Sequence, residues 1–455
     1  MKIWLGVLAI AGCHELVELE GADGISEDAD SDADTDTDAD SDADTDADTD
    51  SGTGTCVDED LDGSCAAEDC DDTNDAIHPG AEEVSAWNLE VVDAANSAGE
   101  SCALALDGDG VAHLHYIAGN GDGGLEPGEF RYATNAGGGW SIERLEGTIS
   151  SHQPTSIAVD RGGGVHIAYL HRDDYSLRYR TRVDDSWEME IVEISGAYGE
   201  GNSLALDGDG AAHVAYHALD GCLVDACDTH LFHATNESGA WATQQVTDSG
   251  NTNGGSIALG SDGRIHITYT VGVWQGDFEV RRAVRDGDEW SDELLTDVTR
   301  GEDTFWGGTC CTGLAIDDDG AAHVSIPGDN LRYMTDAPGD WHEEDLVEKG
   351  WDAYLNVLAL GAGRSLHTVW AAYARAGNYL DGEIHWARAE EIEPGRLRWT
   401  SETIDAIERV DTDVSLVVDP SGLPHVAFVD GADDLVYAVR APTDDGVDQD
   451  CDGDP

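Results

Sequence analysis

Basic residues are scarce in this chain of 455 residues. It contains 22 Lys and Arg against 96 Asp and Glu, and its two lysines are Lys2 and Lys349. Residues 1–55 hold 17 of the acidic residues and one of the basic ones, so residues 56–455 still carry a net charge of −58. Because no basic patch could replace the counterions of a phosphate backbone, nucleic acid is excluded as a partner. A protein with such an acidic surface tolerates high salt, because salt screens the repulsion between its own carboxylates.

Proline, phenylalanine and long apolar runs are also rare. The chain has 10 Pro and 5 Phe, against 55 Gly and 13 Trp. This composition favours an all-β protein rich in turns over a helical one. No apolar run reaches the roughly 18 residues of a membrane span. The length allows roughly two to four domains or one large repeat array.

The first residues have the pattern of an export signal. Met1-Lys2 is followed by an apolar stretch and then by Ile10-Ala11-Gly12-Cys13. This resembles a bacterial lipoprotein signal, which implies a signal peptide over residues 1–12 and a lipidated Cys13. An ordinary signal peptide with an incidental cysteine, or a misplaced start codon, are the alternatives. His14 in place of Asp favours the outer membrane or cell surface of a bacterial envelope, with membrane contact only through the lipid anchor.

An aspartate-rich segment follows. Every even-numbered residue from Asp28 to Asp50 is Asp, twelve in all, and the residues between them are Ala, Ser or Thr. These small side chains bury too little apolar area to offset the entropy of ordering, and the carboxylates repel each other. We therefore expect residues 13–55 to be a disordered tether, with weak, diffuse cation binding as the alternative.

Residues 56–84 combine cysteines with closely spaced carboxylates. Cys56 opens a D-x-D-x-D-G element, followed by Asp69-Cys70-Asp71-Asp72 and then by Pro79-Gly80-Ala81-x-Glu. Carboxylates at alternate positions followed by Gly can wrap around a hard cation, as in the first half of an EF-hand loop. The three pieces resemble metal-binding repeats of bacterial surface proteins that are similar to thrombospondin type 3 repeats. The alternative is a set of solvated acidic loops joined by disulfides.

The C-terminal residues 442–455 repeat part of this pattern and contain Asp448-x-Asp450-Cys451-Asp452. Calcium is the expected ion, because the ligands are hard oxygens. Copper would need His or Met ligands, and only His78 lies nearby. The predicted metal ligands are Asp58, Asp60, Asp62, Asp69, Asp71, Asp72, Asp448, Asp450 and Asp452.

A unit of 44–58 residues recurs along the rest of the chain. It reads apolar-Ala-Leu-Asp, a Gly/Asp turn, His-apolar-x-aromatic, Leu-Arg-Tyr-x-Thr and Gly-x-Trp, which indicates four short strands. Four-stranded units at this period predict a β-propeller. The seven repeat histidines are His113, His166, His213, His266, His323, His367 and His425.

Six copies of the unit contain the tryptophan that opens the fourth strand, and the seventh copy ends without one. The missing strand is at the other end of the repeat region, where Trp87-Asn88-Leu89-Glu90 matches Trp140-Ser141-Ile142-Glu143. Residues 85–92 are therefore predicted to complete blade 7 and close the ring, which removes the open sheet edge. The predicted propeller spans residues 85–441. Its closure would bring residues 56–84 beside residues 442–455 as one composite metal site.

Export implies disulfides. Cys56, Cys65, Cys70 and Cys451 would form two in the composite site, and Cys222 would pair with Cys227. Cys310 and Cys311 could form a vicinal disulfide, or either could reach Cys102. Leaving out Cys13, nine cysteines remain, so at least one is unpaired or intermolecular.

The repeated side chains are predicted to be structural. Equivalent positions in a propeller lie one per blade, so the seven histidines cannot share one ion. Five of them follow an Asp at the end of the first strand, which suggests a buried His–Asp hydrogen bond that holds the hairpin. The repeat tryptophans are expected to pack between blades. The five aspartates are Asp107, Asp160, Asp207, Asp317 and Asp419.

Aromatic residues outside the repeat pattern are candidates for ligand binding. They are predicted to lie in connections of blades four to six, where they could stack on sugars or hold a peptide, and packing between blades is the alternative. The candidates are Trp274, Phe305, Trp306, Trp351, Tyr354, Tyr373 and Tyr379.

Two functions remain open. The first is a calcium-stabilised surface module that binds a glycan or an envelope protein, or acts as a scaffold. The second is a polysaccharide hydrolase or lyase, because the D-x-x-G-x-x-H repeat resembles sialidase-like and lyase propellers in general layout. Sialidase-like catalysis needs an arginine cluster and a Tyr–Glu pair, but Arg131, Arg178 and Arg332 recur with the repeat and are therefore predicted to be structural. The Asp-box motif and a nucleophile–base pair are not evident, so a protein without catalytic activity is favoured.

Overall fold

The computed structural model divides into two compact units, Met1–Val84 with Pro442–Pro455 and Ser85–Ala441. It describes residues 85–442 apart from residues 96–97, 120–127, 150–154, 172–173, 175, 184–185, 194–196, 220–227, 273–276, 299–311, 329–330, 338, 347–350, 362–363, 375–381, 394–395 and 408–413. The predicted signal peptide, tether, acidic module and C-terminal metal element therefore lie outside the described residues. Within the described part, no helix is both long and apolar enough to span a membrane.

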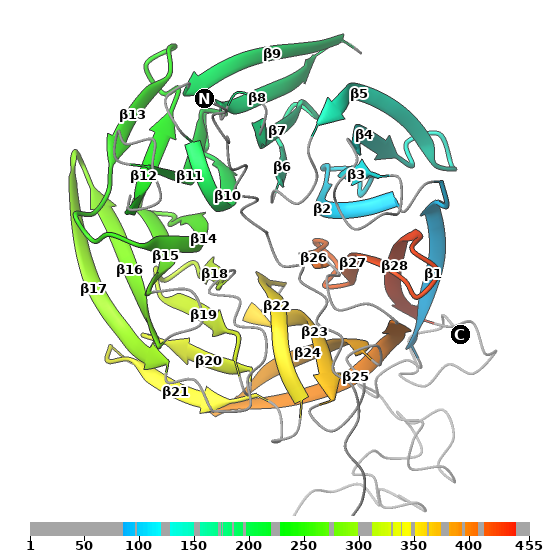
Figure 1. Ribbon diagram of the computed structural model, residues 1–455. Coiled ribbons are helices and arrows are strands. Elements are labelled where there is room, and N and C mark those ends of the chain that lie inside the picture. The colour runs from blue at the N-terminus through cyan, green and yellow to red at the C-terminus, as the bar shows by residue number, and fades with distance from the viewer. Residues whose placement is uncertain are drawn as a thin grey trace, which may run out of the picture. The chain divides into compact units, whose positions relative to one another are not determined.

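The described unit is an all-β, seven-bladed propeller, as predicted. Its 28 described strands form seven four-stranded sheets arranged in a ring (Figure 1). Blades 1 to 4 consist of β2 (Ala98–Leu106), β3 (Ala112–Ala118), β4 (Gly128–Thr134) and β5 (Ser141–Ile149); β6 (Thr155–Val159), β7 (Val165–His171), β8 (Ser176–Val183) and β9 (Ser186–Glu193); β10 (Ala197–Leu206), β11 (Ala212–Leu219), β12 (Thr229–Thr235) and β13 (Ala242–Gln245); and β14 (Thr252–Leu259), β15 (Ile265–Gly272), β16 (Phe278–Asp286) and β17 (Glu289–Val298). Blades 5 to 7 consist of β18 (Gly313–Ile316), β19 (Ala322–Ile326), β20 (Arg332–Thr335) and β21 (His342–Asp345); β22 (Trp351–Leu360), β23 (Leu366–Ala374), β24 (Gly382–Glu393) and β25 (Arg396–Ile407); and β26 (Val414–Val418), β27 (Pro424–Val429), β28 (Leu435–Pro442) and β1 (Ser85–Asp93).

The two ends of the repeat region pair with each other. The seventh sheet has the strand order β1-β28-β27-β26, so the strand predicted at residues 85–92 is the outer strand of blade 7. Figure 1 shows β1 in blue beside β28 in red. β1 therefore covers the edge of β28 that would otherwise be left unpaired.

The antiparallel strand order gives the propeller two different faces. The connections between first and second strands and between third and fourth strands lie on one face, which we call the turn face. The connections between second and third strands and between blades lie on the other, which we call the loop face.

On the turn face, an aspartate shapes the connection between first and second strands. In blade 1, Asp107 Oδ1 accepts hydrogen bonds from the backbone N–H groups of Asp109 and Val111. Gly110 has a φ of 79°, in the left-handed region that Gly adopts without strain. The same bonds recur at Asp160, Asp207, Asp317 and Asp419.

The second carboxylate oxygen of each of these aspartates faces the repeat histidine, as predicted. All seven histidines are buried. The Nε2–Oδ2 distance is within hydrogen-bond range for His166, at 3.1 Å, and His425, at 3.4 Å, but it is 3.6–3.7 Å in the other three pairs. The hairpin is therefore held mainly by the aspartate's bonds to the turn backbone. In four blades the other ring nitrogen of the histidine, Nδ1, bonds to the hydroxyl of Tyr132, Tyr179, Tyr333 or Tyr437 at 2.5–2.6 Å.

The repeat tryptophans pack against the third strand of the preceding blade, as predicted. Six of them make ring contacts at centroid distances of 4.9–5.8 Å, and Trp341 packs instead against the Arg282 guanidinium. The indole N–H of Trp140 also donates to Glu90 on the outer strand of the preceding blade. Equivalent bonds join Trp87 to Glu402, Trp187 to Glu143, Trp241 to Glu190, Trp290 to Gln244 and Trp399 to Glu344.

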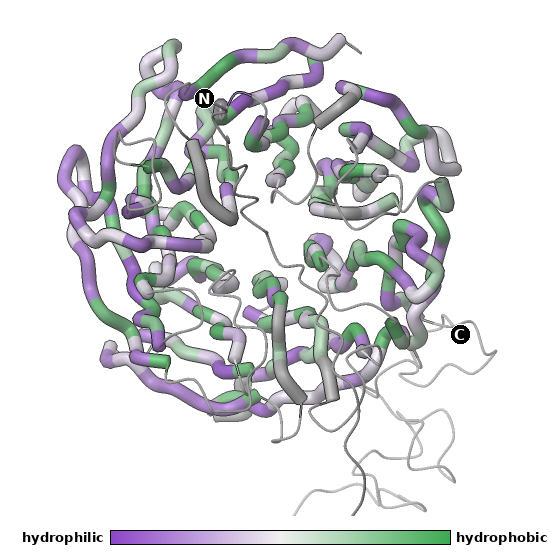
Figure 2. The backbone as a smooth tube through the Cα atoms, viewed as in Figure 1, coloured by the Kyte–Doolittle hydropathy of each residue, from purple (hydrophilic) through white to green (hydrophobic). Residues whose placement is uncertain are grey.

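The core lies between blades. One cluster, for example, packs Phe130 and Tyr132 of blade 1 against Ile157, Ile167 and Tyr169 of blade 2. The outermost strands, such as β17, are mainly hydrophilic, and the hydrophobic segments lie farther inside (Figure 2). Each blade therefore depends on its neighbours for burial, which is why the ring must close.

Candidate functional site

The predicted metal site, lipid anchor and disulfides lie outside the described residues. The residues concerned are Cys13, Cys56, Asp58, Asp60, Asp62, Cys65, Asp69, Cys70, Asp71, Asp72, Cys222, Cys227, Cys310, Cys311, Asp448, Asp450, Cys451 and Asp452. Trp274, Phe305, Trp306 and Tyr379 also lie outside them.

Three of the predicted ligand-binding aromatics belong to strands rather than to connections. Trp351 and Tyr354 lie in β22, and Tyr373 lies in β23 opposite Asp352. Trp351 and Tyr354 were expected in the connection that precedes β22. They belong to the strand itself, because β22 begins at Trp351 and pairs with β23 on both sides of an irregularity in register between Ala353 and Asn356.

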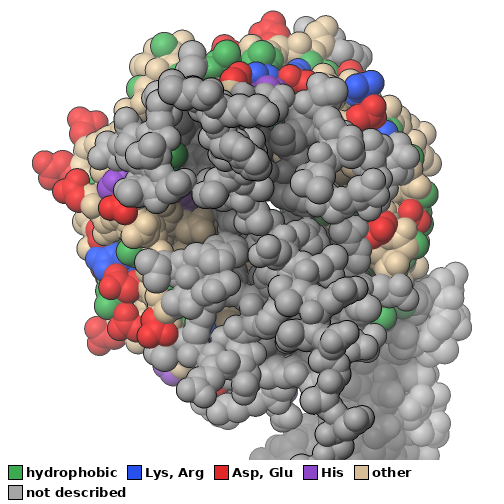
Figure 3. Space-filling model, viewed as in Figure 1, with side chains coloured by type: hydrophobic (Ala, Val, Ile, Leu, Met, Phe, Trp, Pro, Cys, Tyr) green, Lys and Arg blue, Asp and Glu red, His purple; other side chains and the backbone are tan. Residues whose placement is uncertain are grey.

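A group of charged and polar side chains meets between blades 1 and 2. Glu146 extends from β5, the outer strand of blade 1. Tyr169 and His171 come from β7, Asp174 from the connection to β8, and Arg178 and Arg180 from β8 itself. We call these six residues the Glu146 cluster. They lie toward the loop-face ends of their strands, and charges of both signs lie close together on the rim around β8 and β9 (Figure 3).

Both arginines and the tyrosine bond to Glu146. Arg178 Nη1 donates to Glu146 Oε1 at 2.9 Å, and Arg180 Nη2 donates to Oε2 at 2.8 Å. The Tyr169 hydroxyl donates to the same Oε2 at 3.1 Å and accepts from Arg180 Nε at 3.0 Å. This association of a Tyr–Glu pair with two arginines was not predicted from the sequence.

His171 and Asp174 form a dyad beside this glutamate. His171 Nδ1 lies 2.9 Å from Asp174 Oδ1, and His171 Nε2 lies 3.6 Å from Glu146 Oε1. Asp174 also accepts from the Ser176 hydroxyl at 2.6 Å and from Arg178 Nη2 at 2.8 Å. The Asp174 side chain is 46% exposed and that of Glu146 is 24% exposed, whereas His171 is 11% exposed, so Asp174 is the part of the cluster nearest to solvent and His171 lies behind it.

The environment keeps both carboxyl groups ionised. Burial acts to raise the pKa of Glu146, but hydrogen bonds from Arg180 and Tyr169 and the charge of Arg178 lower it overall. Burial likewise opposes ionisation of Asp174, but hydrogen bonds from Ser176, Arg178 and His171 lower its pKa strongly. Burial raises the pKa of the Tyr169 hydroxyl, which is fully buried and so serves as a hydrogen-bond donor. Neither carboxyl group of the cluster is therefore suited to donate a proton near neutral pH.

Simpler versions of the cluster occur in two other blades. In blade 1, Tyr116 and Arg131 donate to Asp93 at 2.7 and 2.6 Å. In blade 4, Tyr269 and Arg281 donate to Asp292 at 2.6 and 2.7 Å, but this carboxylate comes from β17 of the same blade rather than from the preceding blade. The combination of tyrosine, arginine and carboxylate is thus a structural element of the propeller. Blade 2 adds His171 and Arg180, where the repeat in blade 1 has Ala118 and Ala133.

A signal for these additions was present in the sequence. The third strand of blade 2 reads Leu177-Arg178-Tyr179-Arg180-Thr181, with an arginine where the other clear copies have Ala133 or Met334. Glu146 could not be found in this way, because it comes from the adjacent blade and outside the repeat's fixed positions.

No protein-family model matches this chain, and no characterised protein matches it in sequence. Among solved structures, the polysaccharide lyase Uly1 is 10% identical with a TM-score of 0.47, over 76% of this chain and 90% of that one. The α-L-arabinofuranosidase Arb93A from Fusarium graminearum is 12% identical with a TM-score of 0.42, over 79% and 97% of the two chains. The Hadza microbial sialidase Hz136 is 12% identical with a TM-score of 0.41, over 65% of each chain.

These comparisons correct one prediction. The sequence analysis favoured a protein without catalytic activity, but the solved propellers that the chain resembles include a lyase, a glycosidase and a sialidase. The preference for a non-enzyme relied on the lack of a recognisable motif, and such motifs do not transfer between families of one fold. At these identities the likeness itself shows the fold alone.

Proposed function

We propose that the chain is a polysaccharide-degrading enzyme whose active site includes the Glu146 cluster. The observation that carries the proposal is the His171–Asp174 dyad, which lies beside Arg178 and Arg180 in blade 2. Asp174 accepts from His171 Nδ1 and so leaves Nε2 as the proton-accepting nitrogen, directed toward Glu146. The solved propellers named above, which include enzymes acting on carbohydrates, agree with this class of function.

The cluster supports elimination better than hydrolysis. Acid–base hydrolysis of a glycosidic bond needs one carboxyl group that is protonated and one that is ionised. The pKa values of Glu146 and Asp174 are both lowered, so neither carboxyl group is suited to donate a proton. A lyase needs a base that removes the C5 proton beside the carboxylate of a uronic acid, while cations hold that carboxylate. The C4–C5 double bond then forms as the bond from C4 to the glycosidic oxygen breaks, and the departing oxygen takes up a proton from water. His171 would be the base, and Arg178 and Arg180 would bind the acid group together with Glu146, because each guanidinium has five N–H donors.

The remaining expectations from the N-terminal and C-terminal residues belong to the same proposal. Export through residues 1–12 and anchoring at Cys13 would hold the enzyme at the bacterial cell envelope. Calcium bound by residues 56–84 and 442–455 would stabilise the fold. The glycan partner would then be the substrate.

The proposal is tested on the full chain with a panel of acidic and neutral polysaccharides. Wild type is expected to release unsaturated ends from a uronic-acid polymer. His171→Ala should lower the rate by about 100-fold or more, the usual range for loss of a general base. Arg180→Ala should weaken binding of the acid group and also lower the rate. Both variants should fold normally, because blade 1 has alanine at both positions. Asp292→Asn, in the group of Tyr269, Arg281 and Asp292 in blade 4, is the control and should retain activity.

Other outcomes would reject the proposal or change its chemistry. Reducing ends without unsaturated products would replace elimination by hydrolysis. Polysaccharide binding without any cleavage, or full activity in His171→Ala, would refute an active site at this cluster.

A further inference from the structure

Blade 3 differs from blades 1 and 5 in one residue of the turn between its third and fourth strands. The turns of blades 1, 3 and 5 have the same hydrogen bonds, in which an Asn or Asp side chain accepts from the first residue of the second strand and a Thr hydroxyl accepts from the N–H two residues later. The residue at this second N–H is Ala136 in blade 1 and Ala337 in blade 5, but Glu237 in blade 3. The turn can therefore hold alanine or glutamate without a change of backbone.

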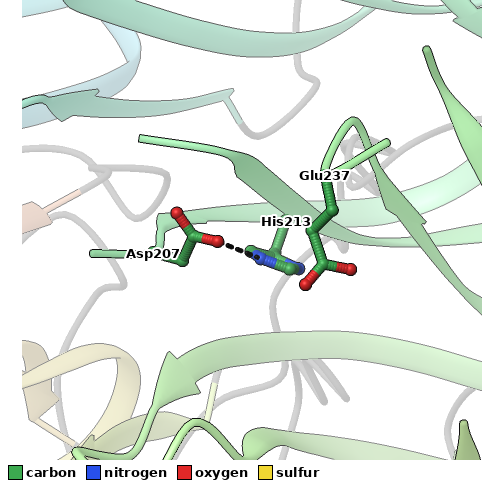
Figure 4. Close-up of side chains that lie close together, drawn as sticks. All are labelled: Asp207, His213 and Glu237. Atoms are coloured by element: carbon green, nitrogen blue, oxygen red, sulfur yellow. Dashed lines mark ion pairs between the residues drawn. The ribbon is translucent and has the colours of Figure 1, made fainter. Parts of the chain in front are cut away.

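Glu237 brings a third potential ligand to the Asp–His pair of its blade. One side-chain atom each of Asp207, His213 and Glu237 lies within 4.8 Å of the others. Figure 4 shows both carboxylates beside the His213 imidazole, Asp207 from the turn before β11 and Glu237 from the turn after β12.

The His213 side chain is buried and has an unsatisfied nitrogen. The residue is 1% exposed, and its Nε2 makes no hydrogen bond in the structure. The nearest carboxylate oxygen, Asp207 Oδ2, is 3.7 Å away, beyond hydrogen-bond range. Asp207 Oδ1 already accepts from the N–H groups of Asp209 and Ala211, so Oδ2 is the oxygen turned toward the imidazole.

A second imidazole lies behind His213. His213 Nδ1 is 3.1 Å from His233 Nε2, whereas in four other blades the repeat histidine has a tyrosine hydroxyl at this place. When Nδ1 donates a proton to His233, Nε2 carries the lone pair on the side of Asp207. Metal-binding histidines are commonly oriented in this way by a partner on the other ring nitrogen.

We propose that Asp207, His213 and Glu237 bind a divalent transition-metal ion of the zinc type. One imidazole nitrogen and two carboxylate oxygens suit zinc, and three protein ligands leave a position for water. The two carboxylate charges match the charge of the ion. Glu237 Oε2 lies 3.4 Å from Arg285 Nη1, and the ion would take over from Arg285 as the counter-charge. The bound ion would join the two turns of blade 3 on the turn face, apart from the Glu146 cluster of blade 2.

The test is a calorimetric titration of the full chain with zinc in excess calcium, which occupies hard-oxygen sites elsewhere in the chain. Glu237→Ala, which reproduces the turns of blades 1 and 5, is expected to bind one zinc ion fewer than wild type. Ala136→Glu, which places a carboxylate beside the Asp107–His113 pair, is expected to bind one more. With cobalt in place of zinc, Glu237→Ala should lose the visible absorption of one four-coordinate ion.

Melting curves give an independent result. Zinc should raise the melting temperature of wild type more than that of Glu237→Ala, because a ligand stabilises the folded state that binds it. Equal zinc stoichiometry and equal cobalt spectra in wild type and Glu237→Ala would overturn the site. Polysaccharide cleavage does not enter this test, so its outcome is independent of the proposed function.

Discussion

A chain that lacks residues 85–93 is expected to lose the cooperative unfolding of the propeller and to aggregate. The deletion removes β1 and exposes the edge of β28. It also removes three links to neighbouring blades, because Trp87 donates to Glu402, Glu90 accepts from Trp140, and Asp93 accepts from Tyr116 and Arg131. The combined loss should exceed the net stability of a typical domain, about 5–15 kcal/mol.

Asp93 accounts for a large part of this effect. Its side chain is 5% exposed and holds the Arg131 guanidinium at 2.6 Å. Asp93→Ala leaves the buried Tyr116 hydroxyl without its acceptor and Arg131 paired with Glu129 alone, and the loss of such a buried partner costs about 3–5 kcal/mol. Asp93→Asn retains an acceptor and should cost less.

The measurement is a thermal melt followed by circular dichroism and light scattering. A chain that begins at residue 85 is the control, since it keeps β1 and should melt cooperatively. A cooperative melt of the deletion variant at the temperature of the parent would show that β1 does not close the ring.

The fold could be predicted because each blade repeats the same interactions. The histidine, the aspartate at the first turn and the tryptophan recur at similar spacings, and each has a structural role in nearly every blade. Even the closure was recognisable, because Trp87 and Glu90 repeat the pattern of Trp140 and Glu143.

The Glu146 cluster and the blade 3 site could not be predicted in the same way. Glu146 meets Arg178 and Arg180 across the boundary between blades, and the spacing within one repeat carries no information on that contact. Glu237 is a single departure from the repeat, and only the folded turn places it beside His213. Repetition therefore identified the framework, whereas the candidate sites depend on the residues at which blades differ.

The protein is also expected to lose stability steeply as the pH falls below about 6.5. His115 and His217 are fully buried, and burial lowers the pKa of each from 6.5 to about 3. Each is neutral in the folded chain but protonated in the unfolded chain between these values, so acid favours unfolding. The free energy of unfolding is unaffected by these histidines above pH 6.5. Below that pH it falls by about 1.4 kcal/mol per pH unit for each histidine. At pH 5 the two together should cost roughly 4 kcal/mol.

Three further histidines act in the same direction. Burial lowers the pKa of His233 to about 3 and those of His266 and His367 to about 4. The net charge of −74 has the opposite effect, because protonation of carboxylates relieves self-repulsion. Salt screens that repulsion but not the cost of charging a buried imidazole, so the acid transition should persist at high salt.

Replacement of one buried histidine isolates its contribution. His217 Nδ1 bonds to the Thr252 hydroxyl at 2.9 Å, and that hydroxyl also lies 3.1 Å from the Thr229 carbonyl oxygen, so it keeps a partner in His217→Leu. Blade 2 has Leu170 at the equivalent position, and the exchange should therefore fit the blade. In urea titrations, His217→Leu should lose about 2 kcal/mol less than wild type between pH 7.5 and pH 5. Parallel losses in the two proteins would show that His217 is not held neutral in the folded state.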